Sequence, residues 1–425
     1  MSEKTIDKVE QNLSRRYARE RRFRFMGMGS VFLGMAALVF LMTTIIGSGW
    51  KAFQQTYIKL DLDLTIENLA VDPADDLEAW NYVDYSGIIK ASLRELFPEM
   101  KSRKQKKEIY KLVSPGADYQ VKQWVESNKE SLGKVSLWLP ADDDVDTFMK
   151  GNVDLESPEN ERRVKDSKIL LIKSLEGEER LEKRFNSIFF TSGDSREPEQ
   201  AGIRGAIIGS FLTMIVTLAL SFPIAVAAAI YLEEFAPKNR WTDIIEVNIN
   251  NLAAVPSIVF GLLGLAVFLN LFGMPRSVPL IGGIVLSLMT LPTIIISSRA
   301  ALKSVPPSIR EAALGLGASR MQVVFHHVLP LALPGMLTGA IIGMAQALGE
   351  TAPLLMIGMV AFVVDIPGGF TDPSTVLPVQ IFLWSDSPER AFVERTSAAI
   401  MVLLGFLIAM NAIAVLLRRR FEQRW

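Results

Sequence analysis

The sequence predicts an α-helical integral membrane protein with six transmembrane helices and a soluble α+β insert between the first and the second helix. Hydrophobic residues make up 49% of the 425 residues and charged residues only 21%, which is too apolar for an ordinary soluble enzyme. Long uncharged runs alternate with basic loops, whereas residues 51–200 contain no run long enough to cross a bilayer. The chain has no cysteine, which excludes disulfides and thiolate metal sites.

The first predicted span covers residues 26–50. It follows a basic tail, residues 1–25, in which arginines crowd ahead of the apolar run. At about 1.5 Å per residue, one helix of this length crosses a hydrocarbon core of about 30 Å. A cleaved signal peptide has a shorter apolar region followed by a small-residue cleavage site, so we expect this helix to be retained.

Residues 51–200 are polar and predict an extracytoplasmic insert domain of mixed structure. The stretches SLRELFPEM and KEIYKLV favour helices, whereas KVSLWLP and SKILLIKSL have the character of strands. About 150 residues is an ordinary size for one domain. The acidic run of residues 142–146 lacks the pattern of an EF-hand calcium loop, so we expect a solvated loop there.

The apolar pattern returns in residues 201–417. Five further spans are predicted near residues 205–231, 248–272, 279–298, 333–363 and 393–417. Lysines and arginines gather in the loops after the second and fourth of the six spans and in the tail of residues 418–425. By the positive-inside rule both termini are then cytoplasmic, and the insert lies on the opposite side of the membrane.

The predicted cytoplasmic loop of residues 299–332 is the most informative segment. It contains SIREAALGLGASRMQVVFHHVLP. Ser308 and Glu311 have the spacing of a capping box, which predicts a helix that begins at Ile309, and Gly315 and Gly317 predict its end two turns later. A short rigid helix with small residues suits insertion into a groove of another protein. From the spacing alone, an ordinary connector between two helices is an equal alternative.

These residues resemble the EAA loop of ABC-importer permeases. The run EAA, the glycine at position 317 and the later LPLALPG match that motif in residues and spacing. Two further segments, NLAAVPSIVFGLLG and GETAPLLMIG, are similar to PstA- and PstC-type phosphate permeases, and the chain resembles the PstA type more closely. The resemblance covers residues 202–420, about half of the chain. Residues 51–200 are similar to an N-terminal extension of some PstA-type proteins.

The resemblance implies a permease subunit of an ATP-binding-cassette importer that moves inorganic phosphate across the cell inner membrane. In that family the loop forms coupling helices that dock on the ATPase. The residues that would carry this coupling are Arg310, Glu311, Ala312, Ala313 and Gly317. The implied partners are a PstC-like second permease, a PstB-like ATPase dimer, a PstS-like phosphate-binding protein and membrane lipid, with no nucleic acid.

Two other functions remain open. A permease for another oxyanion, such as sulfate, molybdate or phosphonate, would share these motifs. A membrane-anchored sensor or scaffold would work through residues 51–200, but it would have no use for an EAA loop.

Glu350 is the main candidate for the substrate pathway. It lies in the middle of a long apolar run, where a carboxylate is costly and marks a functional site by default. A structural pair with an arginine is the alternative. Pro353 interrupts the helix there and could open the backbone toward a cavity. Thr351, Gln346 and Ser257 lie in or beside the same family motifs and complete the candidate pathway.

Arg299 closes the fourth predicted span. It is either a positive-inside anchor, or else an anion contact or a partner for Glu350. The family often has an arginine just ahead of GETAPLL, where this chain has Gln346. Because the predicted span interiors contain no lysine or arginine, an anion path needs positive potential from helix N-termini and from another subunit. We therefore expect a heterodimer whose partner bears an arginine.

No catalytic, cofactor or metal site is expected in this chain. The sequence has no GxxxxGKS or GxxxxGKT run, so we expect ATP hydrolysis in a separate subunit.

Overall fold

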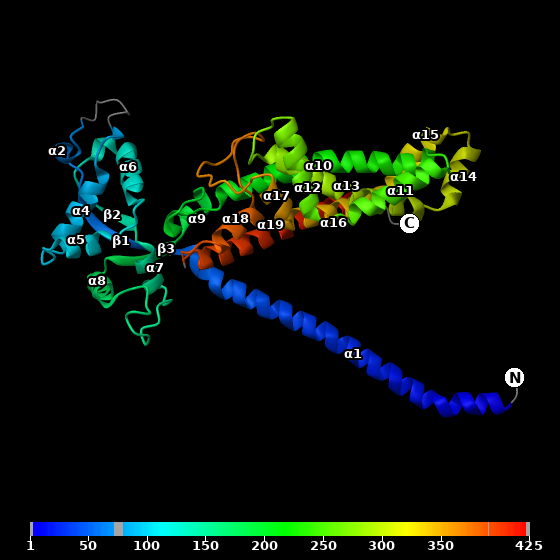
Figure 1. Cartoon of the computed structure of the whole chain (residues 1–425), viewed down its shortest axis with the longest axis horizontal. Coiled ribbons are helices and arrows are strands. Elements are labelled where there is room, and N and C mark those ends of the chain that lie inside the picture. Colours follow the sequence, from blue (N-terminus) through cyan, green and yellow to red (C-terminus); the bar gives the residue numbers. More distant parts are fainter. Residues whose placement is uncertain (1–2, 72–79, 390, 422–425) are drawn as a thin grey trace.

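The computed structural model describes residues 3–71, 80–389 and 391–421. Figure 1 shows a bundle of helices with an α+β insert at one end and a short helical loop at the opposite end. The first helix, α1 (Glu3–Gly49), leaves the bundle at an angle. It contacts α19 (Ala391–Phe421), the last helix of the chain.

The insert is built on a three-stranded antiparallel sheet with the strand order β2–β1–β3. The central strand β1 (Gln54–Asp63) pairs with β2 (Lys134–Pro140) and β3 (Leu181–Phe185), and Ile58 lies opposite Leu139. The alternate residues of β1 that follow Ile58 are buried, because alternate side chains of a strand point to the same face. The strand predicted over KVSLWLP is confirmed, since it is β2.

Helices cover the sheet and enclose a single apolar core that includes Trp80, Leu93, Ile109 and Val121. The helices of the insert are α2 (Ile66–Leu69), α4 (Tyr85–Leu96), α5 (Arg103–Tyr110), α6 (Ala117–Ser127), α7 (Asp143–Met149), α8 (Asp166–Gly177) and α9 (Ser187–Thr191). Short 3-10 turns are η1 (Trp50–Phe53), η2 (Lys129–Ser131) and η3 (Pro198–Gln200). The two predicted helical stretches are confirmed in α4 and α5, although both helices end before the predicted stretches do.

The strand predicted over SKILLIKSL is wrong, because these residues belong to α8. Ile169, Ile172 and Leu175 recur every third residue and are buried together in the core of the insert. A short apolar run rich in isoleucine and leucine fits either a buried strand or a buried helix, and periodicity alone does not separate them.

Five helical segments of the described chain are long and apolar enough to cross a membrane. They are Arg16–Phe53, Arg204–Phe235, Pro279–Ser304, Arg320–Gly349 and Ala391–Arg420. The long helices of the bundle, besides α1 and α19, are α10 (Arg204–Ile230), α13 (Pro279–Ser304) and α16 (Leu329–Gly349). Both α10 and α16 pack along α13, and α19 packs on α16 and on α18 (Leu377–Ser385), a helix that the sequence analysis did not predict.

The continuous span predicted over residues 248–272 is wrong, because the chain is bent there by 99°. One arm is α11 (Arg240–Ala253), and the other is α12 (Ser257–Gly264) with its π-helical extension η5 (Leu265–Leu271). Pro256 stands at the bend, where it cannot donate a backbone hydrogen bond to a continuing helix. The described residues therefore hold five spans, or up to six if the bent pair counts as one.

The continuous span predicted over residues 333–363 is also wrong. The helix α16 ends at Gly349, and Glu350 follows it as a C-cap in an extended conformation. Thr351 is then the N-cap of the short helix α17 (Ala352–Met356). Glu350 therefore lies in a break between two helices and not in the middle of one.

Candidate functional site

A short helix at the end of the bundle remote from the insert forms the first part of the candidate site (Figure 1). This helix, α14 (Pro307–Gly315), begins with a proline, whose fixed φ and missing N–H both suit the first helical position. Gly317 follows it with a φ of +87°, in the left-handed region that favours glycine. The chain then returns to the bundle through α15 (Arg320–Gln322) and the π-helical turn η6 (Val323–Val328).

The capping box predicted for Ser308 and Glu311 is wrong. The N-cap of α14 is Pro306, which makes no side-chain hydrogen bond to the helix. Because two consecutive prolines set the backbone at this point, the helix begins at Pro307 and Ser308 already lies inside its first turn. The end of the helix before Gly317 agrees with the prediction.

The outer surface of α14 is available to another protein. Glu311, Ala312 and Leu314 are exposed, and Leu316, directly after the helix, is 90% exposed. Ala313 is instead buried in the apolar cluster at the base of the loop. An exposed apolar leucine on a short rigid helix is a feature of surfaces that a partner covers.

Arg310 points back toward the bundle. Its Nη2 atom lies 2.8 Å from Oε1 of Glu234, in the π-helical turn η4 (Tyr231–Phe235) that ends α10. The guanidinium also donates to the carbonyl oxygens of Leu302, at 2.9 Å, and Val305, at 2.7 Å, at the end of α13. Arg310 therefore holds α14 in place from inside, whereas Glu311 faces outward.

Arg299 is paired within the same end of the bundle. Its Nη2 atom lies 2.6 Å from Oε1 of Glu246 on α11, and its Nε atom lies 3.4 Å from Oε2 of Glu233 on η4. The predicted alternative in which Arg299 pairs with Glu350 is therefore wrong. The acidic partners of Arg299 and Arg310 were not predicted, although the segment YLEEFAPKNR places Glu233 and Glu234 directly after an apolar helix.

The candidate pathway residues lie at two helix breaks. Ser257 is the first residue of α12, and Glu350 with Thr351 separates α16 from α17. The helices α12 and α17 pack against each other so closely that a Cβ atom on Gly261 would lie 2.6 Å from the Cα atom of Pro353. The packing of α12 on α17 therefore brings these two breaks into one part of the bundle.

Such breaks have a chemical consequence in a membrane. They free backbone N–H and C=O groups, which are tolerated only where they meet protein or line a polar cavity. Glu350 and Thr351 are half-buried, and Gln346 is exposed on the last turns of α16. The break at Glu350 therefore combines a carboxylate with free backbone groups, and both can contact a polar ligand.

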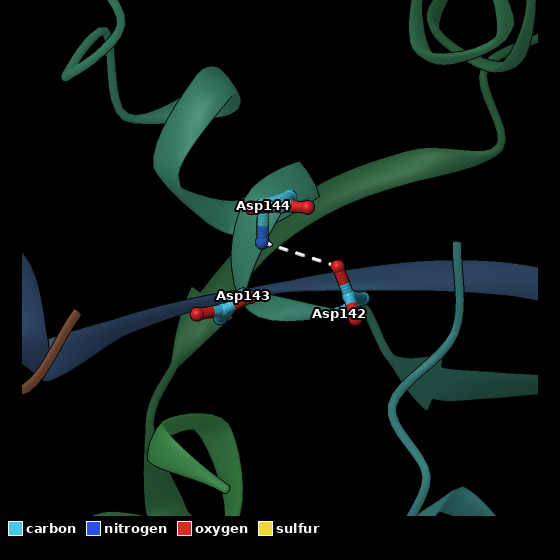
Figure 2. Close-up of side chains that lie close together, drawn as sticks. All are labelled: Asp142, Asp143 and Asp144. Carbon is cyan, nitrogen blue, oxygen red and sulfur yellow. Dashed lines mark hydrogen bonds between the residues drawn. The ribbon is translucent and has the colours of Figure 1, made fainter. Parts of the chain in front are cut away.

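Three carboxylates gather in the insert at the start of α7, as Figure 2 shows. Asp142 caps this helix by accepting a hydrogen bond from the backbone N–H of Asp144 at 3.2 Å. Lys168 lies 2.6 Å from Asp142 and 2.8 Å from Asp144, and Arg163 pairs with Asp143 and Asp144. Burial raises the pKa of Asp143 to about 6. The solvated loop predicted here is wrong, because these residues form a half-buried ion-pair cluster.

Residues 202–425 match the family model described as "Binding-protein-dependent transport system inner membrane component". The chain belongs to this family. Residues 10–159 match a second model, "Domain of unknown function (DUF3333)", which covers most of α1 and much of the insert.

Proteins that are similar to the chain have names that refer to transport. It is 36% identical over 168 residues to the probable ABC transporter permease protein YqgI of Bacillus subtilis, a match that covers 39% of this chain and 56% of YqgI. It is 33% identical over 227 residues to the phosphate transport system permease protein PstA 2 of Mycobacterium bovis, covering 53% of this chain and 74% of that protein. A chain of the MetNI methionine ABC transporter matches with 18% identity and a TM-score of 0.44, covering 52% and 96% of the two chains.

These relatives confirm the resemblance to PstA-type permeases that the sequence motifs predicted. The chain spans little more than half the length of YqgI, at 56%.

Proposed function

We propose that this permease is a transmembrane subunit of an ATP-binding-cassette importer and that it moves inorganic phosphate across the cytoplasmic membrane. The observation that carries the proposal is α14. It is fixed to the bundle by Arg310 and exposes Glu311, Leu314 and Leu316 at the tip of the molecule. A rigid helix can pass a displacement on to the bundle, whereas a flexible loop would absorb it.

In this proposal α14 docks on a separate, PstB-like ATPase dimer in the cytoplasm, and the chain itself is not an enzyme. Both termini lie in the cytoplasm, and the insert faces the outside, where a PstS-like binding protein delivers the substrate. The basic residues Arg299, Lys303, Arg310 and Arg320 near α14 support this orientation. Reporter fusions after residues 120 and 425 should report opposite sides of the membrane, and a common side would contradict the orientation.

A second permease subunit completes the path in this proposal. Within the described residues, the central parts of the candidate membrane spans carry no lysine or arginine, so an anion needs positive potential from elsewhere. A PstC-like partner with an arginine near the break at Glu350 would supply it. The similarity to the phosphate transport system permease protein PstA 2 supports the phosphate cargo.

The test is uptake into proteoliposomes that contain the permease, its partner permease and the ATPase, with binding protein outside and ATP inside. Labelled phosphate should enter only with ATP. Sulfate, molybdate and phosphonate should compete poorly. Uptake of one of these in place of phosphate would assign the permease to another oxyanion. No ATP-dependent uptake of any oxyanion would favour a sensor or scaffold that works through the insert.

A further inference from the structure

Six charged side chains form an ion-pair network of two parts at the α14 end of the bundle. Its members come from η4, α11, α13 and α14. They are Glu233, Glu234, Glu246, Arg299, Lys303 and Arg310. Three are acidic and three are basic, so the network is neutral as a whole. Arg310 pairs only with Glu234, while the other four residues form the second part, and the two parts are joined because Glu233 and Glu234 are consecutive residues of η4.

The two adjacent glutamates of η4 are the centre of this network. Glu234 pairs with Arg310 of α14 at 2.8 Å, while Glu233 pairs with Arg299 of α13 at 3.4 Å and with Lys303 at 3.5 Å. The side chains of Glu233 and Glu234 are only 18% and 11% exposed. Loss of Arg310 would leave the largely buried charge of Glu234 without its ion-pair partner, which is costly, whereas Glu233 keeps Arg299 if Lys303 is lost. The ion pairs therefore resist a separation of α14 from η4.

The network continues from α13 to α11. Arg299 pairs with Glu246 at 2.6 Å, in addition to Glu233. The helix α11 leads directly to the 99° bend, and Ser257 begins the helix on the other side of it. Two sets of ion pairs, joined through the backbone of η4 between Glu234 and Glu233, thus connect α14 to α11, which leads to the helix break at which the candidate pathway begins.

We propose that Glu233, Glu234 and Glu246 are positioning residues that couple the displacement of α14 to α11 and to the bend before Ser257. This inference rests on the proposed function, since it requires an ATPase that moves α14. If α14 were connected to the bundle only through the chain to α13, α11 could keep its position while α14 moved. Arg299 of α13 binds Glu246 of α11, and Arg310 of α14 binds both Glu234, which follows α10, and the carbonyl oxygen of Leu302 at the end of α13. Because the two arginines connect these helices, α10, α11 and α13 respond together when α14 moves.

The experiment measures phosphate uptake and ATP hydrolysis in the same proteoliposomes, with the whole complex present. Glu234→Gln and Glu246→Gln each remove one charge and keep the size of the side chain. We expect ATP hydrolysis to persist while uptake per ATP falls by at least about fivefold, the lower end of ordinary coupling between two sites. A residue with a purely structural role would lower both rates together, through the amount of assembled complex.

Lys303→Gln is the matched control, because Lys303 belongs to the network but its side chain is 59% exposed. It should keep uptake per ATP within about twofold of the wild type. The double variant Glu234→Gln/Arg310→Gln should be no worse than the poorer single variant, because the two side chains act through each other. If the complex with Glu234→Gln does not assemble, the uptake per ATP of the Glu246→Gln complex decides the inference alone. Glu246→Gln should assemble because the side chain of Glu246 is 35% exposed.

Unchanged uptake per ATP in the assembled glutamate variants would overturn the inference. Failure of the proposed function looks different, because the wild-type complex itself would then take up no phosphate. If the wild type transports and Gly317→Ala uncouples it while the glutamate variants do not, only the role of the network is wrong.

Discussion

The Nζ atom of Lys150 lies 2.8 Å from Oε1 of Glu394, although the two residues belong to the insert and to the last long helix. The same Nζ atom lies 2.7 Å from Asp146, and the lysine side chain is only 4% exposed. Beside Glu394, the buried Arg395 donates to the side-chain oxygen of Gln55 at 2.8 Å. Buried charges therefore fix the insert to the first turn of α19. The sequence analysis did not predict this joint.

Removal of the Lys150 charge should weaken the attachment of the insert to α19. Lys150→Met leaves the carboxylates of Asp146 and Glu394 buried without their partner, and it should lower the free energy of unfolding by about 3 kcal/mol. Denaturant unfolding of the purified permease in detergent measures this change. The matched control is Lys122→Met, which removes a partly exposed pair with Glu126 at 3.8 Å and should cost about 0.5 kcal/mol or less. Equal losses in the two variants would show that the joint adds no stability.

The backbone at Gly317 should be essential for coupling, whereas Gly315 should not. A Cβ atom at either position meets nothing within 4 Å, so only the conformation distinguishes them. Gly317 has a φ of +87°, and Gly317→Ala should strain the turn by about 1 kcal/mol and reduce uptake per ATP. Gly315→Ala lies within α14 and should stabilise the helix slightly. The prediction fails if the two alanine variants transport equally well.

Glu350→Gln should weaken the discrimination between phosphate and sulfate. Phosphate near neutral pH still carries a proton that a carboxylate can accept in a hydrogen bond, whereas sulfate presents only acceptors. Loss of this difference should change the ratio of phosphate to sulfate uptake by about tenfold. Asp365→Asn, at an exposed carboxylate after α17, is the control and should leave the ratio unchanged. An unaltered ratio in assembled Glu350→Gln would remove Glu350 from the transport path.

Glu199 should make the stability of the folded protein depend on pH. It is 2% exposed, and burial raises its pKa to about 7 from an ordinary value of 4.5, with the nearby charges of Asp142 and Asp143 acting in the same direction. Between these two values the folded protein keeps the proton that the unfolded chain has lost. The free energy of unfolding should therefore fall as the pH rises through this window, by about 3 kcal/mol in total.

Unfolding midpoints of the wild type and Glu199→Gln at about pH 5 and about pH 8 check this prediction. The wild type should lose more stability than the variant between the two conditions. Because Asp143 also has a raised pKa, a smaller slope should remain in Glu199→Gln. Identical slopes in both proteins would mean that Glu199 ionises normally in the folded state.

Most of the fold followed from run lengths and composition, because membrane spans need long apolar segments. The bend at Pro256 did not follow, since it lies inside a run that was predicted to be one span. An interruption of the helix near Glu350 was predicted from Pro353, but its exact place, before Thr351, emerged only from the folded chain. The position of α14 was predicted within two residues, but its start depends on the backbone of two prolines and not on the side chain of Ser308.

The contacts within the candidate site could be predicted less well from the sequence than the fold. A single sequence does not show which charges meet, so the partners of Arg299 and Arg310 emerged only from the folded chain. The outward position of Glu311 agrees with the expected coupling role, whereas Arg310 supports the helix from inside.

The first and the last strand of the insert in chain order, β1 and β3, lie side by side in its sheet. Asn186 donates its backbone N–H to the carbonyl oxygen of Phe53 at 2.8 Å and its side-chain amide to that of Ala52 at 2.9 Å. A segment whose two ends meet in this way can be gained or lost by a gene without changing the register of the helices on either side. The insert can thus be gained as one unit. A protein with a short connector between α1 and α10 would need only one insertion event to acquire it.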